Sequence, residues 1–188
     1  QRGDISNLHF SLQALRQTGL QTTDEAFAKA LVFLQRTQNL SVTNDFAGKV
    51  PDPDRPGVIL DAVSGDDGGA SYYPGNSSAG YIVRPDGKSI ARSYGSMTYA
   101  LLKAYSLAGL PADDQRVRAA VGWIQDHWEL AVNPGIDPEA GPKAQYQGLF
   151  YYYLLMGQAL DTCGIETVNA HQGDQVIAVD WREALRAH

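Results

Sequence analysis

Two adjacent carboxylates, Asp66 and Asp67, precede Gly68 and Gly69 in the most conspicuous polar cluster of the sequence. Neighbouring carboxylates can hold a divalent cation or share a proton, which would make one of them a general acid. The same residues also form ordinary turns, because Asp and Gly adopt turn conformations readily. The alternating acidic spacing of an EF-hand is missing. Asp66 and Asp67 are therefore the candidate catalytic residues, and a solvated turn is the alternative that composition favours.

A second group of polar side chains stands at the start of each apolar helical segment. If these segments lie side by side, their amino ends open at one place. Unpaired amide donors and the positive end of each helix dipole would then favour a polar or anionic group there. The alternative is that these side chains only cap and pack, and the residues leave both interpretations open. The group comprises Asn7, His9, Tyr94, Ser96, Tyr99, Tyr146, Gln147 and Tyr151.

A metal site has weaker support. Asp161 and Cys163, two positions apart, could bind zinc together with His171 or His188. Cys163 also continues the apolar stripe of its predicted helix, so a small buried side chain is the interpretation that we prefer. We expect no metal and no cofactor, because P-loop, nucleophile-elbow and dinucleotide motifs are all missing from the sequence.

The elements that must position these residues are helices. The stretch from Tyr94 to Leu110 carries one charge, Lys103, and its apolar residues recur at helical spacing. We therefore expect a helix that is buried on most sides and ends at Gly109. An amphipathic helix should follow it, because apolar residues recur at positions 117, 121, 124 and 128 with charges between them.

This unit of an apolar helix, a glycine turn and a more charged helix occurs three times. The first copy covers residues 5–36, and the third begins near Tyr146 and continues with a helix from Asp180. Self-similarity of this kind predicts stacked helix pairs in an array or ring, with an ordinary helical bundle as the alternative.

Three segments interrupt the helices, at residues 41–93, 130–143 and 166–179. A structureless loop as long as the first one is uncommon in a compact domain. Residues 80–84 and 88–91 flank Pro85-Asp86-Gly87, and an Asp-Gly pair between apolar runs predicts a β-hairpin. We expect this hairpin to lie over one end of the helices.

Length and composition limit the possible partners. The chain has 188 residues, 44% of them apolar, 19% charged and ten of them tyrosines, with a formal net charge of −6. The negative charge argues against nucleic acid and anionic membrane surfaces. No apolar run is long enough to span a bilayer. A single cysteine excludes an internal disulfide and leaves the compartment open.

The last predicted helix begins at Asp180 and is only nine residues long at His188. We expect residues 1–188 to form a single domain that is a fragment of a longer protein. Either further repeats or a second copy of the chain, in a homo-oligomer, would cover the open end of the helix array.

Several motifs resemble those of the prenyltransferase and squalene-oxidase repeat proteins, in particular the uncharacterised bacterial squalene-cyclase-like proteins. The resemblance covers most of the chain. It implies an all-α fold, an α/α toroid or partial toroid of helix hairpins with a small β-hairpin insertion. The motifs are DGG-x-x-Y-x-P at residues 67–74, RSYGSMTYALL at 92–102, NPG at 133–135, QGL-x-YYY at 147–153 and DWR at 180–182.

The resemblance also implies a function. An apolar central cavity lined by aromatic side chains would suit an isoprenoid chain or its carbocation. A bacterial source is implied, with export left open. The residues that the resemblance and the helix starts together assign to ligand binding are Tyr72, Arg92, Tyr94, Tyr99, Tyr146, Gln147 and Tyr151.

The chain departs from the family at the positions that carry its chemistry. The Asp-x-Asp-Asp acid motif of triterpene cyclases is missing, since Asp52-Pro53-Asp54-Arg55 lacks the pair and Asp66-Asp67 lacks the leading Asp. The Asp-x-Cys of protein prenyltransferases is replaced by residues 144–147, which contain no Cys. Two hypotheses remain. One is a terpenoid cyclase or prenyltransferase-like enzyme, complete only in the full-length protein. The other is a non-catalytic module that binds a ligand or a protein.

Overall fold

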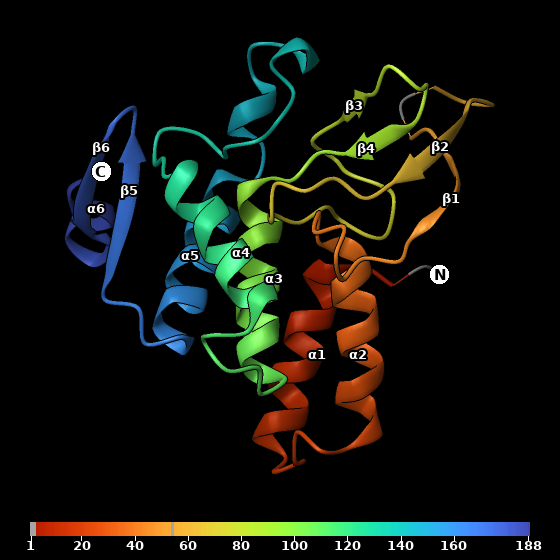
Figure 1. The fold of residues 1–188 in the computed structure, drawn as a ribbon. Coiled ribbons are helices and arrows are strands. Elements are labelled where there is room, and N and C mark those ends of the chain that lie inside the picture. Colours follow the sequence, from red (N-terminus) through yellow and green to blue (C-terminus); the bar gives the residue numbers. More distant parts are fainter. Residues whose placement is uncertain (1–2, 54) are drawn as a thin grey trace.

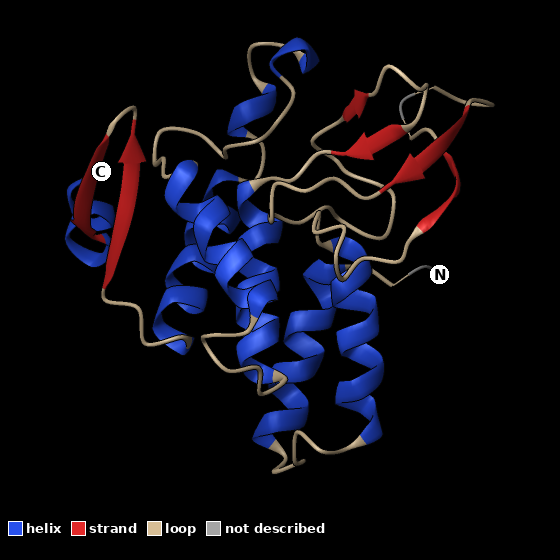
Figure 2. Ribbon diagram, in the orientation of Figure 1, coloured by secondary structure: helices blue, strands red, loops and turns tan. Residues whose placement is uncertain are grey.

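The computed structural model describes residues 3–53 and 55–188, so Asp54 of the acidic stretch discussed above lies outside it. Helices and strands are both present in the described chain (Figure 2). Within the described residues the α-helices are α1 (Ile5–Gln17), α2 (Glu25–Thr37), α3 (Gly95–Leu107), α4 (Gln115–Asp126), α5 (Leu149–Thr162) and α6 (Trp181–Ala187).

The strands form two sheets. The first contains β1 (Ala47–Pro51), β2 (Ile59–Val63), β3 (Tyr81–Val83) and β4 (Ser89–Ala91) in the order β1-β2-β4-β3. Its outer pairs are antiparallel, and the central β2–β4 pair is parallel. The second is an antiparallel hairpin of β5 (Thr167–Gln172) and β6 (Gln175–Asp180).

The all-α toroid expected from the sequence is therefore wrong, because the fold is mixed α/β. The hairpin around Pro85-Asp86-Gly87 is confirmed as β3 and β4. It is not an isolated insertion, however, since β1 and β2 extend it into a mixed sheet. Residues 166–179, expected to be a loop, form most of the second hairpin. In both segments backbone donors and acceptors pair between strands rather than within helices.

The helices themselves begin and end close to where the sequence places them. Asp4, Asp24 and Asp114 cap α1, α2 and α4, each accepting a hydrogen bond from a first-turn backbone N–H. Gly19 and Gly109 follow α1 and α3 with φ of +85° and +84°, which an L side chain rarely adopts. The caps and the apolar stripes thus fix these elements locally.

Helix α3 is the centre of the helical layer. It packs between α1 and α5, with α4 against it, as Figure 1 shows. All of its residues from Gly95 to Tyr105 are buried, including Lys103. Each large apolar side chain buried here contributes about 1.5–3 kcal/mol, so α3 is a major source of hydrophobic stabilisation.

The connection between β2 and β3 contacts the amino ends of α1 and α3. The Tyr72 carbonyl accepts from the Ile5 N–H at the start of α1, and the Ala70 carbonyl accepts from the Tyr94 N–H before α3. These contacts are made by the segment that leads into the hairpin of β3 and β4, rather than by the hairpin itself. No helix in residues 3–53 and 55–188 is long and apolar enough to cross a membrane.

Candidate functional site

A cavity of about 460 Å³ opens where α1, α3 and α5 begin, and we call it the amino-end cavity. It brings together four of the residues assigned to ligand binding from the sequence, namely Tyr72, Tyr94, Gln147 and Tyr151. Asn7 and Ser96 from the helix starts also line it. The remaining lining residues are Ser6, Phe10, Ser78, Met97, Asn133, Ile136 and Gly148.

One loop residue organises the floor of this cavity. Tyr94 precedes α3 without a side-chain cap. The side-chain cap comes instead from Asn133, whose Oδ1 accepts from the Ser96 N–H (3.1 Å) and whose Nδ2 donates to Ser96 Oγ (2.8 Å). Gly95 N–H donates to the Pro134 carbonyl at 2.9 Å. The NPG and YGS motifs of the sequence are therefore two halves of one helix cap.

The glycines of these motifs are required by close approach. A Cβ on Gly135, which has φ of +90°, would lie 2.2 Å from the Ser93 carbonyl oxygen. A Cβ on Gly95 would lie 2.5 Å from the ring of Tyr152. Only a residue without a side chain lets the loop and α5 pack this closely around the start of α3.

The cavity wall contains hydroxyl groups that stay protonated at neutral pH. Burial raises the pKa of Tyr151 to about 12 and raises the pKa of Tyr94 as well. Tyr72 OH lies 3.4 Å from Ser6 Oγ, and Ser6 Oγ donates to Asp4 at the rim. The wall can therefore offer neutral hydrogen-bonding groups beside aromatic rings.

Behind Tyr151 lies a buried polar cluster that joins the three apolar helices. Tyr151 OH lies 3.2 Å from Nε2 of His9, which is fully buried. His9 Nδ1 is 3.5 Å from the Lys103 ammonium, which also donates to Gln13 Oε1 and Gln158 Oε1, both at 2.7 Å. We call these five side chains the buried polar cluster, in which His9 and Lys103 are buried and the other three are half-buried. Desolvation and the nearby Lys103 charge lower the pKa of His9 to about 4, so its ring is neutral at pH 7.

Sequence reasoning placed His9 and Tyr151 of this cluster among the polar residues at the helix starts, but it did not assign Lys103, Gln13 or Gln158. One signal was present, because Lys103 is the only charge between Tyr94 and Leu110. An ionisable residue in a buried helix requires partners, and His9 and Gln13 stand one helical turn apart on the neighbouring helix. The sequence does not show how neighbouring helices are aligned, so these side chains of different helices could not be paired in advance.

Asp66 and Asp67 do not line the amino-end cavity. Asp66 accepts from the Ser41 N–H and hydroxyl at 2.8 and 2.9 Å. Asp67 accepts from the Gly69 N–H and the Ser93 hydroxyl at 3.0 and 2.8 Å. Both side chains thus support a turn.

The two glycines of that turn meet α4. A Cβ on Gly68 would lie 2.5 Å from the Ala119 carbonyl oxygen, and a Cβ on Gly69 would lie 2.7 Å from the Trp123 ring. Close packing against a helix is therefore a sufficient physical reason for the Asp-Asp-Gly-Gly sequence.

Three other predicted ligand-binding residues lie elsewhere. Tyr99 is 1% exposed in the core, with its ring 5.6 Å from that of Tyr152. Tyr146 is 52% exposed and does not line the cavity. Arg92 forms an ion pair with Asp137, with 3.3 Å between Nε and Oδ2.

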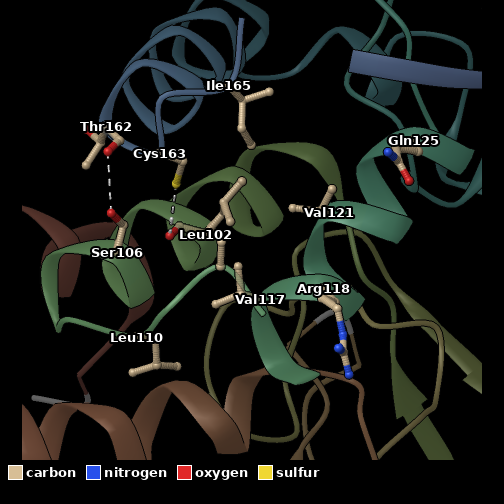
Figure 3. Close-up of a pocket in the computed structure, with 11 residues that line it drawn as sticks. Leu102, Ser106, Leu110, Val117, Arg118, Val121, Gln125, Thr162, Cys163 and Ile165 are labelled. Carbon is tan, nitrogen blue, oxygen red and sulfur yellow. Dashed lines mark hydrogen bonds between the residues drawn. The ribbon is translucent and has the colours of Figure 1, made fainter. Parts of the chain in front are cut away.

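A second cavity, of about 550 Å³, lies at the opposite ends of α3 and α5. Leu102, Leu110, Val117 and Val121 form its apolar wall, and Cys163 lies at its upper side (Figure 3). The Arg118 side chain extends away from this apolar wall in the same view. Burial raises the pKa of the Cys163 thiol, which is the behaviour of an unreactive packed side chain.

The described residues contain no group of three or more His, Cys, Asp or Glu side chains that could hold a metal ion. Asp161, the other half of the considered zinc pair, accepts from Arg182 Nη2 at 2.7 Å. His171 pairs with Asp126 on α4. Comparisons with protein-family models, curated proteins and solved structures found no match to this chain.

Proposed function

We propose that the chain is a small-molecule-binding module and that the amino-end cavity is its binding site. The ligand has an apolar body that lies against tyrosine rings and a neutral oxygen-bearing head that meets their hydroxyls. An isoprenoid alcohol is a ligand of this kind, and the resemblance to squalene-cyclase-like proteins favours that class.

The observation that carries the proposal is the convergence of Tyr72, Tyr94, Gln147 and Tyr151 in one cavity. They come from three separate parts of the chain, and the cavity volume falls within the range of about 300–1,000 Å³ typical of small-molecule sites. Aromatic rings with a few polar groups are the usual lining of such sites.

Binding without catalysis is the hypothesis that the acidic residues favour. A cyclase needs a carboxylic acid that reaches the ligand, whereas Asp66 and Asp67 accept hydrogen bonds within their own turn. No Asp or Glu is among the described residues that line the cavity.

The test is a titration of the protein with geraniol, a C10 isoprenoid alcohol, followed by NMR shifts of backbone amides. The expected result is saturable shifts at Ser96, Met97 and Gly148, which line the cavity. The saturated C10 hydrocarbon of the same skeleton should bind more weakly, by about tenfold, because it leaves the hydroxyls of the wall unpaired.

A pair of glutamines gives a matched control. Gln147 lines the cavity, whereas Gln145, also exposed, does not. Gln147→Trp should obstruct the cavity and abolish the shifts, and Gln145→Trp should leave them unchanged. Equal binding by both variants, or shifts confined to the apolar cavity around Cys163, would refute the assignment of this site.

A further inference from the structure

The buried polar cluster contains a cation without a carboxylate partner among the residues that the structure describes. Lys103 is 2% exposed, and its Nζ contacts two amide oxygens and one imidazole nitrogen. The ring of Phe10 covers it, with 5.3 Å between Nζ and the ring centroid. Burial disfavours the charged form of a lysine, so an ammonium at such a position loses its proton more readily than an exposed one.

The geometry fixes how the protons are placed when Lys103 is charged. An ammonium has three donors and no lone pair, so it can only donate to Gln13, Gln158 and His9. The His9 Nδ1 must then be the acceptor, and in the neutral ring Nε2 carries the proton. Nε2–H donates to the oxygen of Tyr151, and the Tyr151 hydroxyl proton is left to point toward Ser6 and the amino-end cavity.

The arrangement reverses when Lys103 is neutral. A primary amine keeps two donors for Gln13 and Gln158 and gains a lone pair. His9 then satisfies that lone pair by donating from Nδ1, so Nε2 becomes the acceptor. Tyr151 donates to Nε2, and its oxygen is free to accept a proton from the cavity. Both states keep every hydrogen bond within the cluster, with only the direction changed.

We propose that Tyr151, His9 and Lys103 form a proton relay between the amino-end cavity and a buried amine. In the forward step the Lys103 ammonium gives a proton to His9 Nδ1, and His9 passes its Nε2 proton to the Tyr151 oxygen. Tyr151 then gives its own hydroxyl proton to an oxygen anion of the bound ligand. The lysine is left as a neutral amine and the ligand as a neutral hydroxyl, so charge and protons balance.

This relay rests on the proposed function, since it acts on a ligand held in the same cavity. Tyr151 is the residue that contacts the ligand, while His9 and Lys103 act through it. Desolvation lowers the pKa of Lys103, and a neutral His9 can both accept and donate. Asp4, Tyr72 and Tyr94 are titratable groups near the Tyr151 end of the relay, and Asp4 also acts on His9.

The test uses the complete chain without ligand, labelled with ¹⁵N in lysine and histidine and titrated by NMR. Lys103 should lose its proton at a lower pH than the exposed Lys29 and Lys88. At the same midpoint, the protonated nitrogen of His9 should change from Nε2 to Nδ1. If the 3.5 Å contact between Lys103 Nζ and His9 Nδ1 does not couple the two side chains, the His9 tautomer stays constant through the Lys103 midpoint.

Two variants act as controls. Lys103→Arg keeps the positive charge and cannot lose it, so His9 should stay protonated on Nε2 over the whole pH range. Lys29→Arg should change nothing at His9. The relay is refuted if Lys103 titrates together with the exposed lysines, or if the His9 tautomer is the same on both sides of the Lys103 midpoint.

This titration and the geraniol experiment can fail separately. A constant tautomer with normal geraniol binding removes the relay and keeps the binding site. A tautomer exchange without geraniol binding shows that the charge of Lys103 sets the direction of the hydrogen bonds of His9, and it removes the isoprenoid alcohol as the ligand.

Discussion

Replacing Asn133 by alanine should lower the stability of the protein, because Asn133 caps the start of α3, which lies far from it in the sequence. The substitution removes the acceptor of the Ser96 N–H and the donor to the Ser96 hydroxyl, and Asn133 is only 2% exposed. A lost helix cap costs about 1 kcal/mol, and a buried donor without a partner costs about 1–3 kcal/mol more. We therefore expect a loss of about 3 kcal/mol in the free energy of unfolding.

Urea denaturation measures this loss, with an unchanged slope showing that the folded state keeps its compactness. For a chain of this size the same loss corresponds to a fall in Tm of about 6–12 °C. Hydrogen exchange of the Ser96 and Met97 amides should accelerate more than exchange in α2. The control is Asn169→Ala on the exposed side of β5, which should change stability by less than about 0.5 kcal/mol. A loss below that value for Asn133→Ala would refute the role of Asn133 as the cap.

Three further outcomes are expected. Gly135→Ala should prevent stable folding, as seen by circular dichroism, because its Cβ would meet the Ser93 carbonyl, whereas Gly87→Ala at a similar φ but in open space should cost only about 1 kcal/mol. Between pH 6.5 and 4 the unfolded chain binds a proton at His9 that the folded chain does not, so the free energy of unfolding should decrease by up to about 3 kcal/mol as the pH is lowered from 6.5 to 4. Urea denaturation of His9→Gln should lack this part of the pH dependence, and the same pH dependence in both proteins would contradict the buried neutral histidine. Cys163 should react with iodoacetamide at pH 8 about tenfold more slowly than free cysteine, as measured by mass spectrometry, and an equal rate would contradict the packed thiol.

The helices could be predicted from the sequence because their signals are local. The stripe of apolar residues in α3, the cap at Asp114 and the glycine at position 109 each act within one or two turns. The hairpin of β3 and β4 was predicted for the same reason, since an Asp-Gly turn joins two short strands.

The remaining strands were missed for two different reasons. The parallel pair of β2 and β4 joins residues more than twenty positions apart, and no local pattern marks such a pairing. The hairpin of β5 and β6 did have a local signal, because Val168 and Ala170 alternate with polar residues before Gly173-Asp174 and a continuous apolar run, residues 176–179, follows it. It was obscured by the expectation that a helix pair would continue to the end of the chain.

The candidate site could be predicted in part. The expectation that the apolar helices open at one place brought Tyr94, Gln147 and Tyr151 together, and the structure places all three in one cavity. Tyr99 belongs to the same helix start, but it lies on the face of α3 that packs against Tyr152. A helix that is apolar on all sides gives no sequence signal for the side that faces a cavity. That side depends on the neighbouring elements, which one sequence does not show.

The position of Lys103 also determines the axial stagger of the helical layer. Its ammonium binds Gln13 of α1 on one side and Gln158 of α5 on the other. Leucine and alanine contacts would tolerate a shift of α3 along its axis, whereas a shift of one turn, about 5.4 Å, would strand the charge among hydrocarbon groups. A single cation therefore selects one alignment of three helices whose apolar surfaces alone would permit several.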